Sequence, residues 1–87
     1  MYAIVYTTQA AKDIKKIKKA NLASKAKSLI ELIRENPYQN PPSYEKLCGN
    51  LQGAYSRRIN VQHRLVYEVI ESKKTIKIIS LYNHYPK

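Results

Sequence analysis

Residues 53–70 read Gly-Ala-Tyr-Ser-Arg-Arg-Ile-Asn-Val-Gln-His-Arg-Leu-Val-Tyr-Glu-Val-Ile. On either side of the short link Val61-Gln62, apolar and polar residues alternate along the chain, and β-branched and aromatic residues are frequent. A period of two with this composition is typical of β-strands. We therefore expect strands at 54–60 and 63–71 that form a hairpin. The same alternation at 75–83 predicts a third strand beside them.

The N-terminal part of the chain predicts one strand followed by two helices. Residues 2–6 are β-branched and aromatic, as in a buried strand. Apolar residues then recur every three or four positions in two successive segments, which is the period of helices with one buried face. The turn between them is expected at Ala20-Asn21, with Asn21 as a candidate N-cap for the second helix. Pro37 disfavours helical geometry in the residue before it, so this helix should end near Glu35.

The order of these elements, β-α-α-β-β-β, predicts the α+β class and a single domain over residues 1–87. In this arrangement, the N-terminal strand and a two-helix hairpin pack on a mainly antiparallel four-stranded sheet. Residues 36–53 are rich in Pro, Asn and Gly and are expected to form a long loop. Long loops in small domains are often functional, and this one contains Glu45.

The charge of the chain predicts a polyanionic partner. Its 16 Lys and Arg residues outnumber its 6 Asp and Glu residues, for a formal net charge of +10. This exceeds the magnitude of about 2–8 that suffices for the solubility of a small domain. A positive field of this size attracts nucleic acid or an acidic protein. Five lysines lie on the first predicted helix, opposite its apolar side, at positions 12, 15, 16, 18 and 19.

Cysteine and histidine are too few for several classes of site. The single Cys48 excludes an internal disulfide, and one cysteine with two histidines does not make a standard zinc site, so we expect no cofactor. The N-terminus has no apolar run of signal-peptide length, and no segment has the length and apolar composition of a membrane span. The expected location is therefore the cytoplasm, without a membrane partner.

A few residues could together cleave RNA without a metal. Such cleavage needs a base for the ribose 2′-hydroxyl, a cation for the anionic transition state and an acid for the departing 5′-oxygen. Glu45 is the available base, and His84 is the natural acid because histidine titrates near neutral pH. Arg58 and Arg64 are the natural phosphate ligands, since a guanidinium offers paired donors that match phosphate oxygens.

Each of these residues could also have an ordinary structural role. Glu45 taken alone is most often a solvated loop carboxylate, and the arginines could lie on an exposed strand face or pair with strand carboxylates. Adjacent Arg57 and Arg58 point to opposite faces, so at most one of them faces a site on the sheet, and alternation does not decide which. His63 at the edge of the hairpin is expected to be structural. His84 could belong to a frayed terminus.

Residues 45–67, together with His84-Tyr85, strongly resemble the YoeB/Txe toxins of the RelE superfamily. The pattern Leu-x-Gly-x-Tyr-Ser-Arg-Arg-Ile-x-x-x-His-Arg-Leu-Val-Tyr at 51–67 is long and highly specific. The likeness covers nearly the whole chain and is weaker in the two helices. The resemblance implies a RelE-like fold similar to a small microbial ribonuclease. It also implies a toxin that cleaves messenger RNA, usually in the aminoacyl site of the translating ribosome.

The resemblance also implies roles for individual residues. Carried over position by position, Glu45 corresponds to the general base and His84 to the general acid. Arg64 corresponds to the main transition-state stabiliser, and Arg58 supports it. Tyr85 corresponds to the residue that stacks on or orients the nucleotide. These are the residues that the chemistry of metal-free cleavage selects, with Tyr85 added.

Partners follow from the same resemblance. We expect a cognate antitoxin of the YefM/Axe kind with an acidic segment, messenger RNA and the 70S ribosome, and either a homodimer or a heteromeric toxin–antitoxin complex. A lysine surface on the first helix, formed by Lys12, Lys15, Lys16 and Lys19, is a candidate for docking on ribosomal RNA, with solubility alone as the alternative. Two rival functions stay open, which are a non-enzymatic inhibitor that occupies RNA or the ribosome and a regulator that acts with a partner at promoter DNA.

Overall fold

The computed structural model describes residues 1–49 and 53–82. Its elements are, in chain order, β1 (Ala3–Tyr6), α1 (Thr8–Lys19), α2 (Ala23–Glu35), β2 (Glu45–Lys46), β3 (Ala54–Arg58), β4 (Arg64–Ile70), a 3-10 turn η2 (Glu71–Lys73) and β5 (Thr75–Ser80). The predicted α+β class is confirmed, and each predicted strand and helix is found within a few residues of its expected position. In the described part of the chain, neither helix has the length and apolar composition that a membrane span requires.

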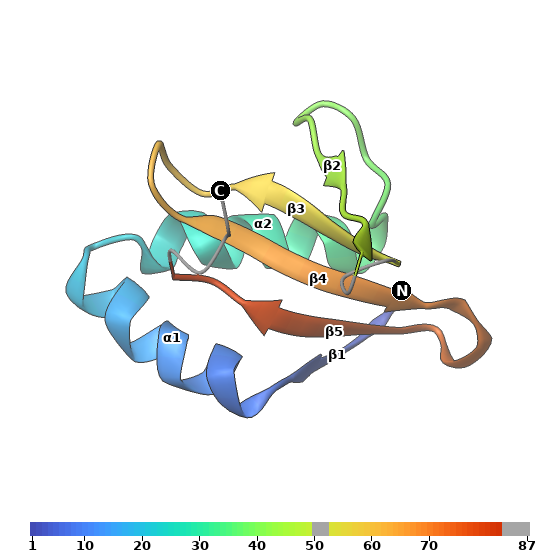
Figure 1. Ribbon diagram of the computed structural model, residues 1–87, viewed down its shortest axis with the longest axis horizontal. Helices are drawn as coiled ribbons and strands as arrows, with labels where there is room; N and C mark the ends of the chain where they lie inside the picture. Colours follow the sequence, from blue (N-terminus) through green and yellow to red (C-terminus); the bar gives the residue numbers. More distant parts are fainter. Residues whose placement is uncertain (50–52, 83–87) are drawn as a thin grey trace.

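One mixed sheet organises the fold, in the strand order β1-β5-β4-β3-β2 (Figure 1). β1 runs parallel to β5, and the other neighbouring pairs are antiparallel, as the expected mainly antiparallel sheet requires. Within the described part of the chain the sheet has five strands, where four were predicted. The additional strand is β2, whose Glu45 pairs with Ser56 and whose Lys46 pairs with Tyr55. It lies within residues 36–53, where only a loop was expected, because two residues are too few to give a period.

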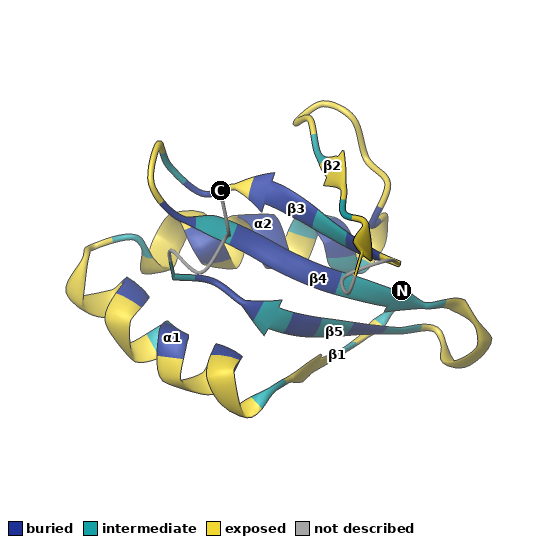
Figure 2. Cartoon of the chain, viewed as in Figure 1, coloured by how far each residue is buried: buried dark blue, intermediate teal, exposed yellow. Residues whose placement is uncertain are grey.

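The helices pack against one face of the sheet and form the core with it. Each helix turns a stripe of buried residues inward and an exposed face outward (Figure 2). The buried core comprises Ala10, Ile17, Ala26, Leu29, Ile30, Ile33, Ile59, Leu65, Tyr67, Ile76, Ile78 and Leu81. This packing explains why the strands alternate so clearly in sequence, since only one of their faces contacts the helices.

The structure corrects one helix boundary. Asn21 was the candidate N-cap of α2, but Leu22 occupies that position, and no side chain of the described residues caps the helix there. Asn21 has a φ of 60° and turns the chain between the two helices. Asparagine tolerates this left-handed conformation better than most residues, so the same residue type suits both roles. The turn at Ala20-Asn21 is where it was predicted, and α2 ends at Glu35 as expected.

Asp13 connects the basic helix to the end of β5. Its side chain is fully buried on the inner side of α1. One carboxylate oxygen accepts the backbone N–H groups of Leu81 at 2.9 Å and Tyr82 at 3.3 Å, and the other accepts the side-chain amide of Gln9 at 2.8 Å. Sequence reasoning missed this role. A buried carboxylate with such donors fixes the direction in which the chain leaves the sheet.

Candidate active site

Four polar side chains gather on the face of the sheet that the helices do not cover. Glu45 of β2 lies opposite Ser56 of β3, and Arg58 of β3 lies opposite Arg64 of β4. Residues paired in this way project to the same side of an antiparallel sheet. The other face of β3 and β4 packs against the core through Tyr55, Leu65, Tyr67 and Val69, and Ile59, just after β3, joins them. The sheet thus separates a polar site from the apolar core.

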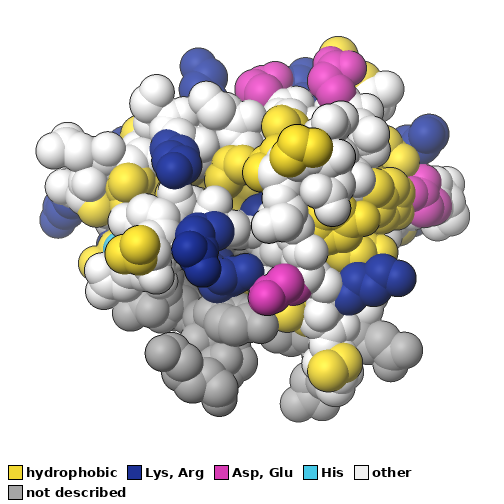
Figure 3. Space-filling model, turned by 90° about the horizontal axis from the view of Figure 1, so that it is seen from above, with side chains coloured by type: hydrophobic (Ala, Val, Ile, Leu, Met, Phe, Trp, Pro, Cys, Tyr) yellow, Lys and Arg dark blue, Asp and Glu magenta, His cyan; other side chains and the backbone are white. Residues whose placement is uncertain are grey.

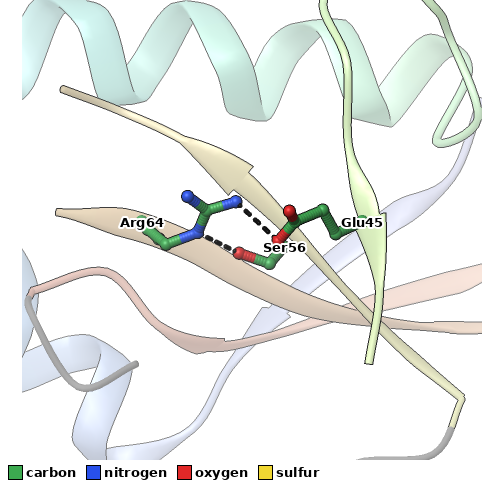
Figure 4. Close-up of polar contacts among 3 residues, drawn as sticks. All are labelled: Glu45, Ser56 and Arg64. Atoms are coloured by element: carbon green, nitrogen blue, oxygen red, sulfur yellow. Dashed lines mark hydrogen bonds and ion pairs between the residues drawn. The ribbon is translucent and has the colours of Figure 1, made fainter. Parts of the chain in front are cut away.

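Arg64 is held in place from two sides. Its Nε donates a hydrogen bond of 2.6 Å to Oγ of Ser56, and its Nη2 lies 3.1 Å from Oε1 of Glu45 (Figure 4). The side chain of Arg64 is only 19% exposed, whereas that of Glu45 is 62% exposed. The guanidinium is therefore fixed on the sheet, while the carboxylate stands at the surface.

A polar pocket of about 330 Å³ surrounds this pair and is lined by Pro42, Ser43, Tyr44, Glu45, Arg58 and Arg64. Its volume is at the small end of the range of about 300–1,000 Å³ for ligand sites. In the view of Figure 3, Lys and Arg side chains lie next to an acidic side chain near the middle of the surface. Two guanidinium groups beside one carboxylate suit an anion whose neighbour must lose a proton, such as a phosphate next to a ribose hydroxyl.

The overall fold and this pattern of residues match a known family. The sequence model of one protein family, the YoeB-like toxins of bacterial type II toxin–antitoxin systems, matches residues 6–85. The chain belongs to this family. Toxin YoeB of Synechocystis sp. is 39% identical to it over 75 residues, which are 86% of this chain and 78% of that protein. The resemblance that residues 45–67 indicated is thereby confirmed, and the protein is the toxin of a type II toxin–antitoxin system.

Solved structures agree with this assignment. The toxin superposes on the YoeB/ParE toxin from Agrobacterium tumefaciens with a TM-score of 0.86 at 29% identity, over 95% of this chain and 99% of that chain. It superposes on a chain of the YoeB-YefM complex from Staphylococcus aureus with a TM-score of 0.81 at 39% identity, over 98% of this chain and 99% of that one. The RelE/YoeB-like fold implied by the resemblance is confirmed.

The structure decides which of the two adjacent arginines faces the pocket. Arg58 is exposed and lines it, whereas Arg57 is fully buried on the opposite side of β3. The alternative of an exposed strand face is therefore wrong for Arg57. The carboxylates that follow in β4 and η2 have other partners, because Glu68 pairs with Nζ of Lys77 at 3.4 Å and Glu71 accepts tyrosine hydroxyls.

The remaining predicted residues lie away from the pocket or beyond the described part. The lysine surface of Lys12, Lys15, Lys16 and Lys19 is exposed on α1, on the side opposite the core. The candidate acid His84 and the candidate stacking residue Tyr85 lie outside the described residues.

His63 is structural, as expected from its place at the hairpin. It is buried, and its ring stacks on that of Tyr82 with 4.3 Å between ring centres. The ammonium of Lys16 lies 5.3 Å from the centre of the same tyrosine ring. These contacts fix the ring of Tyr82, the last described residue. The carboxylate of Asp13 accepts the N–H of the preceding residue, Leu81.

Sequence reasoning missed two residues of the site. Ser56 alternates with Arg58 along β3 and so shares its face, which is a signal that the sequence contains. Tyr44 lines the pocket from the loop, and nothing in its sequence surroundings indicates this. Both lie beside Glu45, Ser56 across the strand pair and Tyr44 as its chain neighbour.

Proposed function

We propose that the toxin is a metal-independent endoribonuclease that cleaves messenger RNA at the ribosomal aminoacyl site and so inhibits translation. The observation that supports this most is the contact of Glu45 with Arg64 in an open polar pocket, with Arg58 beside them. A carboxylate and two guanidinium groups supply the base and the phosphate ligands that 2′-hydroxyl attack requires.

In this mechanism Glu45 takes the proton of the ribose 2′-hydroxyl as the oxygen attacks the adjacent phosphorus. The high exposure of its side chain lets it exchange the guanidinium for a substrate hydroxyl. Arg64, held by Ser56, faces the charge that develops on the phosphate oxygens, and Arg58 adds a second cation from the neighbouring strand. His84 protonates the departing 5′-oxygen, and Tyr85 stacks on or orients the nucleotide.

The toxin binds a cognate antitoxin of the YefM/Axe kind, and an acidic segment of the antitoxin makes the contact. The Staphylococcus aureus relative was solved as a YoeB-YefM complex, and the net charge of +10 here favours an acidic partner. An acidic chain placed over Arg58 and Arg64 would occupy the groups that otherwise bind phosphate. Inhibition by this antitoxin then follows from competition for the same cations.

Mapping of messenger 5′ ends tests the proposal. In a reconstituted translation reaction, the toxin should create new 5′ ends in phase with the reading frame, and Glu45→Gln and His84→Gln should each remove them. Cleavage of a free RNA by high toxin concentrations should continue in EDTA and leave a 2′,3′-cyclic phosphate. If translation stops while every message stays intact, the toxin is a non-enzymatic inhibitor. If the toxin alone retards promoter DNA in a gel mobility-shift assay, the role of a regulator at promoter DNA is favoured instead.

The lysine surface of α1 should bind ribosomal RNA. Its four members recur at i, i+3, i+4 and i+7, so they form one basic stripe. Replacement of all four by glutamine should weaken ribosome binding and make it less sensitive to salt, with a logarithmic salt slope smaller by roughly 0.7–0.9 for each phosphate that the variant no longer neutralises. Ribosome pelleting between low and moderate salt concentrations measures both quantities.

A control variant separates this surface from net charge. It removes the same number of charges from exposed lysines elsewhere, at Lys25, Lys27, Lys73 and Lys74. If both variants lose affinity equally, only the total charge matters. If neither does, the lysines of α1 serve solubility.

A further inference from the structure

The loop that leads to Glu45 is attached to a buried guanidinium. Residues 36–44 connect α2 to β2 without regular structure, and Arg57 reaches them from β3. Its Nη1 donates to the carbonyl oxygen of Pro42 at 2.6 Å, and its Nη2 donates to those of Pro37 at 3.1 Å and Gln39 at 2.8 Å. One side chain thus binds three carbonyl groups spread over most of the loop.

Two tyrosines complete the surroundings of this guanidinium. The hydroxyl of Tyr67 accepts a hydrogen bond of 3.0 Å from Nε of Arg57 and donates one of 2.8 Å to the carbonyl of Pro37. Burial raises the pKa of Tyr67, so the hydroxyl keeps the proton that it donates. The ring of Tyr44 lies 4.7 Å from Cζ of Arg57, within the range of a cation–π contact. The guanidinium therefore contacts the residue next to Glu45.

The position of Arg57 rules out direct contact with a substrate in the pocket. Its side chain is fully buried on the face of β3 opposite Arg58 and Arg64. A buried cation is tolerated only when its donors are satisfied. Here carbonyl groups and a hydroxyl satisfy four of them, and these acceptors come from the loop and from β4. The buried guanidinium of Arg57 therefore holds the loop of residues 36–44 in place.

Glu45 needs such support, because β2 is too short to fix it. The strand consists of two residues paired with β3. Two residues contribute few ladder hydrogen bonds, and the preceding loop has no helix or strand of its own. A displacement of a catalytic group by about 1 Å can cost a factor of the order of 10² in rate.

We propose that Arg57 is a positioning residue that holds the loop at Pro37, Gln39 and Pro42, and thereby places Glu45 against Arg64. This rests on the proposed function insofar as Glu45 is the base. It is independent of that function insofar as Arg57 orders the loop.

The substitution Arg57→Lys tests both parts. Lysine keeps the charge, but a compact ammonium cannot reach three carbonyl groups in the geometry of a guanidinium. Hydrogen–deuterium exchange of backbone amides should become at least 10-fold faster in residues 38–46, while α1 and α2 keep their protection. In single-turnover cleavage, the maximal rate should fall by roughly 10–10²-fold, with less than about a 3-fold change in the RNA concentration for half-maximal rate.

A double-mutant cycle separates positioning of Glu45 from general destabilisation. In a Glu45→Gln background, Arg57→Lys should cost less than about 3-fold in cleavage, because the base it positions is already absent. Tyr67→Phe, which removes one hydroxyl from the same network, should shift exchange and rate in the same direction by a smaller factor. The control Arg34→Lys changes a half-buried arginine of α2 that pairs with Glu31, and it should alter neither readout.

Equal losses in the two backgrounds, unchanged exchange in residues 38–46, or loss of protection throughout the molecule would overturn the positioning role. Faster loop exchange in a protein whose wild type does not cut RNA would retain Arg57 as the organiser of the loop and refute the proposed nuclease function instead.

Discussion

Replacement of Glu45 by glutamine should lower the rate of messenger cleavage by about 10²–10⁴-fold, the range typical of a general base. Glutamine has the same shape and keeps an oxygen within reach of Arg64, which now lies 3.1 Å from the carboxylate. It cannot accept the proton of the 2′-hydroxyl. The substitution therefore removes the proton transfer and leaves the geometry of the pocket nearly intact.

Two measurements make this expectation specific. Single-turnover cleavage gives the chemical rate, and filter binding of a substrate with a 2′-deoxy group at the cut site gives affinity, which should change by less than about 5-fold. Glu68→Gln is the matched control, because this carboxylate also lies on a strand but pairs with Lys77 outside the pocket. If Glu45→Gln cleaves as fast as Glu68→Gln, then Glu45 is not the base.

The carboxylate of Glu45 is 62% exposed and contributes little to folding, so the loss of activity in Glu45→Gln should not reflect unfolding. Surface pairs of this kind typically stabilise a protein by about 0–1 kcal/mol. We therefore expect Glu45→Gln to unfold near the urea concentration that unfolds the wild type. Urea unfolding curves of the purified variants check this before any kinetic comparison.

The sequence contains the main strands of this fold but not its smallest one. The strands β3, β4 and β5 were predictable because one face of each packs on the helices, which imposes a period of two on the chain. β2 was not, because it exists through pairing of Glu45 with Ser56 and has no period of its own. Its existence depends on contacts between segments that are distant along the chain.

The site was predictable by residue type and only partly by position. Alternation separates Arg57 from Arg58 but does not say which one is buried. Arg57 is the buried one because backbone carbonyl groups of the loop accept its hydrogen bonds. Every residue type has a backbone carbonyl, so the sequence does not show which carbonyls will bind the arginine. The burial of Asp13 was likewise hidden, since its partners are backbone N–H groups at the end of β5.

Arg64→Lys should lower cleavage by about 10²–10³-fold, the usual effect of removing one group that stabilises transition-state charge. The hydrogen bond of 2.6 Å from Nε of Arg64 to Oγ of Ser56 fixes the plane of the guanidinium. Lysine has neither this donor nor a second one in a fixed plane, so it loses both its orientation on the sheet and the paired contact with phosphate oxygens. The charge alone should recover only part of the rate.

Arg58→Lys provides the comparison that ranks the two cations. Arg58 lies directly opposite Arg64 on the same face, but its side chain is exposed. An exposed cation is screened by water and less fixed, so its replacement should cost only about 10-fold, mostly in RNA affinity. Single-turnover rates over a range of RNA concentrations separate affinity from chemistry for both variants. A larger loss of maximal rate in Arg58→Lys than in Arg64→Lys would reverse their roles and make the exposed arginine the main stabiliser of the transition state.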